Sequence, residues 1–130
     1  MKKFSVFIIA ILSVLVVLAA PAQEKKKEMK ETTITGEVID VNCCLKSSMM
    51  GGTGDDHKEC AISCIKRGLP VGILEDKTEK VYLVLPGKGG GANSDTTITK
   101  FIAGKVKLTG TFYEKGGMKL FKYTNVEEMK

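Results

Sequence analysis

Five segments rich in β-branched and aromatic residues follow one another in this 130-residue chain, and each is separated from the next by turn-forming residues or a loop. This pattern is typical of short β-strands. The first segment is interrupted by Gly36, and a glycine inside a strand indicates a bulge or a sharp bend. The predicted strands cover residues 32–42, 71–75, 80–85, 105–114 and 118–126.

One short helix is predicted between the third and fourth strands. Asp95 is a good N-cap for a helix over 96–103, and Gly104 ends it. Five strands with a helix in this place follow the order of an OB-fold barrel. Five strands are few for a β-sandwich, which is the alternative. The sequence therefore predicts a mainly β protein, with a five-stranded OB-like barrel over 32–130.

The amino-terminal segment has the pattern of a secretory signal. An uncharged apolar run over 4–20 follows two lysines, and Ala20-Pro21-Ala22 has the small-x-small form of a cleavage site. We predict a signal peptide over 1–22 and a periplasmic or secreted bacterial protein. An uncleaved anchor is the alternative, because the run approaches the length of a membrane span. After cleavage, no stable membrane insertion is expected.

A charged, flexible leader is predicted over 23–31, where lysines and glutamates alternate in short runs. The formal net charge of the whole chain is only +5. A charge this mild, together with export, argues against nucleic acid as a partner. The sequence identifies no specific ligand or protein partner.

An insertion over 43–70 separates the first two predicted strands and holds all four cysteines and the single histidine. Within it, Asp56 is a candidate N-cap for a helix over 57–67. Gly68 is a candidate glycine cap at the other end, and Pro70 prevents the helix from continuing. A helix this short needs packing or a crosslink to hold it.

The cysteines and the histidine are predicted to face one another. His57, Cys60 and Cys64 stand at i, i+3 and i+7, which places them on one face of the helix. Cys43 and Cys44 are expected at the end of the first strand. This arrangement has three interpretations.

The main interpretation is a disulfide staple, since four cysteines in a small exported domain normally pair. A bridge between Cys43 and Cys44 would be strained, and a bridge between Cys60 and Cys64 within one helix has awkward geometry. Bridges from Cys43 or Cys44 to Cys60 or Cys64 remain. Such a bridge closes a loop of about 20 residues and contributes about 3 kcal/mol.

The first alternative is a metal site for zinc or copper. A set of three cysteines and one histidine suits tetrahedral Zn²⁺, and sulfur ligands near Met49 and Met50 equally suit Cu(I). The second alternative is thiol redox chemistry at Cys60 or Cys64, although the C-x-x-C motif is missing. The candidate metal ligands are Cys43, His57, Cys60 and Cys64.

No catalytic motif is present in the sequence. It has no phosphate-binding G-x-x-x-x-G-K-[ST], no H-E-x-x-H and no evident Ser-His-Asp set. We therefore predict a non-enzymatic, exported OB-like binding module whose Cys/His helix is stapled to the barrel.

Four short stretches also support a resemblance. The chain resembles small exported bacterial proteins that carry an OB-like barrel with a Cys/His-bearing helical insertion. The resemblance implies a fold and no activity. Cys44 departs from the pattern, which argues against a scheme with two disulfides. The stretches are GEVIDVNC (36–43), HKECAISC (57–64), GLPVG (68–72) and GKVKLTG (104–110).

Overall fold

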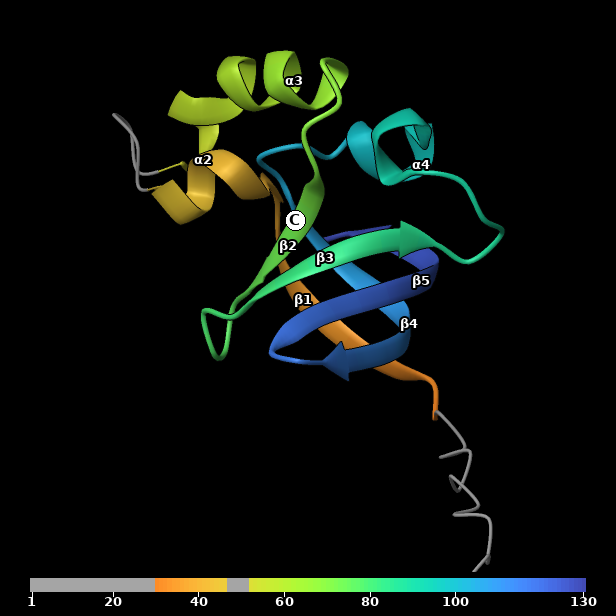
Figure 1. Cartoon of the computed structure of the whole chain (residues 1–130). Coiled ribbons are helices and arrows are strands. Elements are labelled where there is room, and N and C mark those ends of the chain that lie inside the picture. Colours follow the sequence, from red (N-terminus) through yellow and green to blue (C-terminus); the bar gives the residue numbers. More distant parts are fainter. Residues whose placement is uncertain (1–29, 47–51) are drawn as a thin grey trace, which may run out of the picture.

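The computed structural model describes residues 30–46 and 52–130 (Figure 1). The predicted signal peptide over 1–22, the part of the leader over 23–29, and Met49 and Met50 lie outside these residues. No helix in the described part of the chain is both long enough and apolar enough to span a membrane.

Five strands form a closed barrel in the order β1-β2-β3-β5-β4, with β4 pairing back to β1 (Figure 1). The pairs are antiparallel except β3 with β5, which is parallel. This confirms the predicted five-stranded OB-like barrel. The strands are β1 (Thr32–Asp40), β2 (Val71–Glu75), β3 (Val81–Pro86), β4 (Lys105–Lys115) and β5 (Met118–Glu128).

Gly36 lies where β1 changes partners. The strand pairs with β4 through residues 32–37 and with β2 through residues 36–40. A Cβ atom at Gly36 would lie 2.1 Å from the carbonyl oxygen of Leu74. Only glycine lets the two backbones approach this closely, which accounts for the glycine at this point of β1.

The barrel interior is filled by apolar side chains from all five strands. Phe112 follows Val106 and Leu108 at alternate positions of β4, but unlike them it is 36% exposed. The reason is that β4 pairs with β1 only as far as Gly110, so residues 111–115 form an edge that pairs with β5 alone. The fully buried barrel residues include Val38, Ile73, Val106, Leu108 and Phe121.

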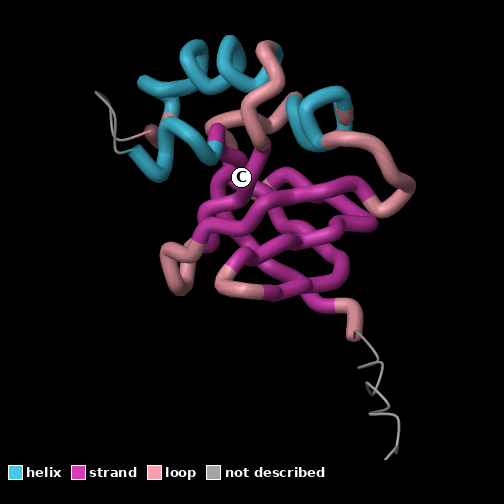
Figure 2. The backbone as a smooth tube through the Cα atoms, viewed as in Figure 1, coloured by secondary structure: helices cyan, strands magenta, loops and turns pink. Residues whose placement is uncertain are grey.

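The helices lie together at one end of the barrel, as the ribbon and the tube both show (Figures 1 and 2). Between β1 and β2 the chain forms α2 (Val41–Lys46), the 3₁₀ turn η1 (Asp55–His57) and α3 (Lys58–Lys66). We call these three elements the helical cap. Between β3 and β4 it forms the 3₁₀ turn η2 (Ala92–Ser94) and α4 (Thr96–Thr99).

The placement of Cys43 and Cys44 at the end of the first strand was wrong, because β1 ends at Asp40 and both cysteines lie on α2. The Asp40 carboxylate causes the change in direction. Its Oδ1 atom accepts a hydrogen bond from the backbone N–H of Asn42 at 3.0 Å, which is an N-cap interaction. The aspartate therefore starts a helix where strand propensity alone favoured continuation.

Helix α3 covers most of the predicted segment, although its start differs. Asp56 is not the N-cap, because the 3₁₀ turn η1 precedes the helix and α3 begins at Lys58. The other end is as predicted. Gly68 has a φ of +100°, and the N–H groups of Gly68 and Leu69 bond to the carbonyls of Ile65 and Cys64. This is a Schellman motif with glycine at C′.

Helix α4 begins as predicted but is shorter. Asp95 caps it by accepting the N–H of Thr97 at 2.7 Å, while the helix ends at Thr99 and not at Ala103. Beyond Thr99 the chain turns toward β1. The N–H of Ala103 donates to the carbonyl of Val38 at 2.8 Å, and this contact competes with further helical turns.

Candidate metal centre

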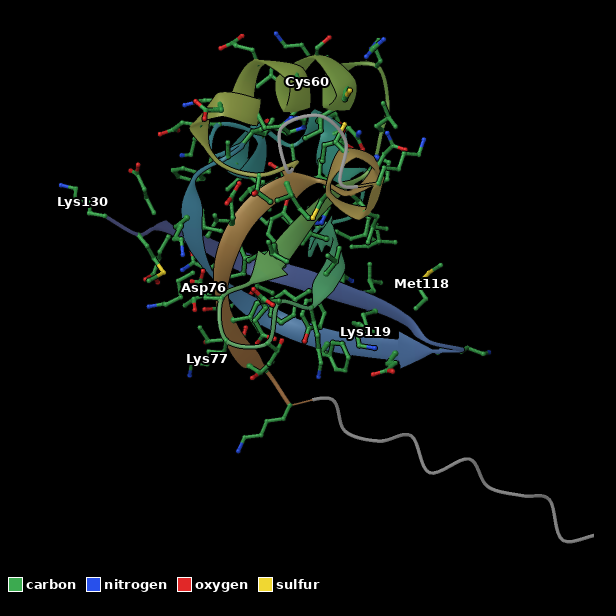
Figure 3. The ribbon with its side chains drawn as sticks, turned by 90° about the vertical axis from the view of Figure 1, so that its left-hand side faces the viewer. Cys60, Asp76, Lys77, Met118, Lys119 and Lys130 are labelled. Carbon is green, nitrogen blue, oxygen red and sulfur yellow. The ribbon has the colours of Figure 1, made fainter. Side chains whose placement is uncertain are left out.

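Three cysteines from the two helices of the cap meet at its centre. Cys43 comes from α2, while Cys60 and Cys64 lie one turn apart on α3. Their Sγ atoms all lie within 4.8 Å of one another. Cys43 and Cys64 are buried, and Cys60 is exposed on the surface of α3 (Figure 3). The cluster is therefore open to solvent on one side.

A second group shares Cys43 with the first. A carboxylate oxygen of Asp40, the Cys43 sulfur and a ring nitrogen of His57 also lie within 4.8 Å of one another. All three residues are buried, and Asp40 has no exposed surface. We refer to the two groups as the thiol triad (Cys43, Cys60, Cys64) and the mixed triad (Asp40, Cys43, His57).

Two polar atoms of the mixed triad have no hydrogen-bond partner. They are Asp40 Oδ2 and His57 Nε2, and no other buried side-chain nitrogen or oxygen in residues 30–46 and 52–130 shares this condition. Buried polar groups are nearly always paired, since desolvation without a partner is costly. A cation held by the mixed triad would lie close to both residues.

The Cys43 thiol lies in an environment that favours its protonated form. The Asp40 carboxylate beside it, together with burial, raises the pKa of Cys43 to about 12. A metal ion that binds this sulfur must therefore displace a firmly held proton. On the other side of the thiol triad, Arg67 Nη2 lies 3.4 Å from Cys64 Sγ and places a positive charge beside it.

No disulfide joins any of the four cysteines, all of which are free in the described structure. The predicted staple between Cys43 or Cys44 and the helix is therefore not present. Cys44 belongs to neither triad, and burial is the main cause that raises its pKa. The structure thus favours the metal alternative over the disulfide interpretation.

The four predicted ligands are brought together, but not as a single set. His57 groups with Asp40 and Cys43, whereas Cys60 and Cys64 group with Cys43 alone. Asp40 was not among the predicted ligands, because the predicted strand over 32–42 includes it. Its spacing of three residues from Cys43 is the signal that could have found it, once a helix is recognised after Asp40.

The two triads differ in chemical character. Three thiolates form a soft set of the kind that binds Cu(I) or Zn²⁺. A carboxylate, an imidazole and a thiolate form a borderline set whose members are each ordinary zinc ligands. Cys43 is common to both triads, so its sulfur is the central group of the cluster.

We compared the chain with protein-family models, with curated proteins and with solved structures, and none of them matches it.

Proposed function

We propose that this protein binds a thiophilic metal ion, Zn²⁺ or Cu(I), in its helical cap. One observation carries the proposal: three cysteine sulfurs converge beside the two buried polar atoms that have no partner within the described chain. Metal coordination accounts for both features at once.

The spacing of the sulfurs suits a metal ion. With Zn–S bonds of about 2.3 Å, the sulfurs of a tetrahedral site lie about 3.8 Å apart. The Sγ atoms of the thiol triad are all within 4.8 Å of one another, so small side-chain rotations bring them to that separation. The backbone of α2 and α3 already holds the three residues at the required places.

The exposure of one ligand supports reversible binding. Cys43 and Cys64 are buried, whereas Cys60 faces solvent. An incoming ion can meet Cys60 first and then be drawn to the two buried sulfurs. Because one ligand is exposed and the other two lie behind it, an ion can bind without unfolding of the cap.

We further propose that the protein acts outside the cytoplasm as a non-enzymatic metal-binding module. The support for export is the signal-peptide pattern over residues 1–22. In an oxidising compartment, disulfide formation competes with metal binding for the same thiols. The metal must therefore bind before the cysteines are oxidised.

The test is a metal titration of the reduced protein in the absence of oxygen, followed by native mass spectrometry. We expect Zn²⁺ or Cu(I) to bind stoichiometrically to the wild type. Cys64→Ser should weaken binding at least tenfold. Cys44→Ser is the matched control, since Cys44 neighbours Cys43 but lies outside both triads, and it should bind like the wild type.

Two results would contradict the proposal. One is an absence of stoichiometric metal from the reduced wild-type protein. The other is protein isolated from the exported compartment with no metal and with every cysteine resistant to alkylation before reduction. The second result would restore the disulfide interpretation.

A further inference from the structure

We propose that the cluster holds two zinc ions, with the Cys43 thiolate bridging them. The first ion lies in the thiol triad, as in the proposed function on which this inference rests. The second lies in the mixed triad, between Asp40, Cys43 and His57.

The geometry of the cluster points to two positions. Each triad has its three ligand atoms within 4.8 Å of one another, and the two triads share only Cys43. A thiolate sulfur has enough lone pairs to coordinate two ions at once. The shared residue is thus of the type that can bridge.

Burial gives the second argument. If one ion were bound by the three cysteines alone, Asp40 Oδ2 and His57 Nε2 would stay buried without a partner. Asp40 is fully buried, and His57 is only 5% exposed, so water has little access to either. An ion in the mixed triad supplies a partner to both, since carboxylate oxygen and neutral imidazole are zinc ligands.

The charge and the ligand types of the cluster select the ion. With ligands deprotonated for metal binding, Asp40 and the three cysteines carry four negative charges, and Arg67 beside Cys64 supplies one positive charge. A site this negative favours divalent cations over Cu(I), and Asp40 is a poor ligand for a soft ion. The cluster therefore suits a pair of divalent zinc ions.

Zinc stoichiometry tests this inference, measured by native mass spectrometry and by elemental analysis of the reduced full chain. We expect two zinc ions per wild-type protein. His57→Ala and Asp40→Asn should each bind one, and Cys44→Ser should bind two. The Asp40→Asn variant keeps a side-chain oxygen that can accept the Asn42 N–H, so α2 should stay capped in it.

The outcomes separate the two proposals. One zinc ion in the wild type, unchanged in His57→Ala and Asp40→Asn, would overturn the second site and leave the proposed function standing. An absence of bound zinc in the reduced wild type would overturn both. Two ions in the wild type and one in these variants would support both.

Cobalt substitution decides the question if a variant fails to fold. Two high-spin Co²⁺ ions joined by a thiolate couple antiferromagnetically, so the electron paramagnetic resonance signal per cobalt should fall as the second equivalent binds to the wild type. Absorption from sulfur-to-cobalt charge transfer should continue to rise. A signal that grows in proportion to cobalt through the second equivalent would show that Cys43 does not bridge two ions, and would overturn the inference.

Discussion

The barrel and the helical cap are built on different physical principles. The barrel buries apolar side chains from all five strands, and its backbone groups pair around a closed ring. In the cap, several of the most buried groups are sulfur or polar: Asp40, at its junction with β1, and Cys43, His57 and Cys64 within it. In the described residues, the two buried side-chain atoms without a hydrogen-bond partner lie at this junction and in the cap, on Asp40 and His57 respectively. The comparison indicates that the barrel forms the apolar core, whereas the cap and its junction with β1 hold the candidate metal ligands.

Helix length strengthens this contrast. Helix α2 has six residues and α3 has nine, and isolated helices of these lengths are marginal in water. Apolar anchoring of α3 comes mainly from Ala61 and Ile65, which join the barrel core. Asn93, from η2, adds a side-chain hydrogen bond to the carbonyl of Ile65 at 3.2 Å. A metal ion that links α2 to α3 would add the crosslink that the cap otherwise lacks.

The largest effect is expected from a cavity in the barrel. Phe121 is fully buried, so Phe121→Ala should lower the free energy of unfolding by about 3–5 kcal/mol. The loss should be equal with and without zinc, because the barrel does not depend on the ion. Chemical denaturation of both forms measures it. A loss below about 1 kcal/mol would show that the barrel is not the stabilising unit.

A smaller effect, confined to the metal-bound form, is expected from Cys60. At a free zinc concentration about 100 times the dissociation constant, a single bound ion stabilises the fold by about 2.7 kcal/mol. Cys60→Ser should remove most of this gain. Without metal the same change should alter stability by no more than about 0.5 kcal/mol, because Cys60 is exposed.

Thermal unfolding with and without zinc measures both effects of Cys60→Ser. Cys44→Ser is the control and should retain the full zinc-dependent gain. If Cys60→Ser retains it as well, the exposed cysteine is not a ligand and the thiol triad is wrong.

Asp95 tests a contact of the barrel with α4, away from the metal cluster. It caps α4 and accepts a hydrogen bond from the Tyr123 hydroxyl at 2.6 Å. Asp95→Ala should cost about 1 kcal/mol through the lost cap, and the Tyr123 hydroxyl would lose its partner as well. Denaturation at neutral pH measures this loss, which should not depend on zinc.

The same contact predicts a pH dependence. Hydrogen bonds from Thr97 and Tyr123 hold the pKa of Asp95 below its ordinary 3.8. The ionised carboxylate therefore contributes stability above pH 3.8, and this contribution is lost as the pH falls from 3.8 through the lowered pKa of the folded state. In Asp95→Asn this part of the acid dependence should vanish. If the wild type and Asp95→Asn lose stability identically as the pH falls, the ionised Asp95 carboxylate does not stabilise the fold.

The smallest effect is expected at the tip of the β4–β5 hairpin (Figure 3). Lys119 Nζ lies 3.2 Å from Glu114 Oε1, and both side chains are partly exposed. Lys119→Ala should change the free energy of unfolding by less than about 0.5 kcal/mol, since surface ion pairs contribute little. Zinc binding should be unchanged. A larger loss would show that the hairpin contributes more to the barrel than its exposure suggests.

Local patterns were sufficient to predict most of the fold. Alternating apolar residues indicated the strands, Gly36 marked the bend, and Gly68 and Asp95 marked helix ends. Each of these signals acts over a few residues and depends on backbone preference, so it can be read without knowledge of distant contacts. The end of α4 was predicted wrongly because contacts with β1 decide where the chain turns.

The sequence by itself determined which chemistry the protein can offer. It confined every cysteine and the histidine to one insertion, and helical spacing placed Cys60 and Cys64 on a common face. Only the tertiary structure decided how these groups combine. The N-cap interaction of Asp40 starts α2 directly after β1, and this helix brings Cys43 close both to His57 and to the thiols of Cys60 and Cys64. That arrangement depends on the barrel closing beneath the cap, because contacts between distant segments set the positions of its ligands.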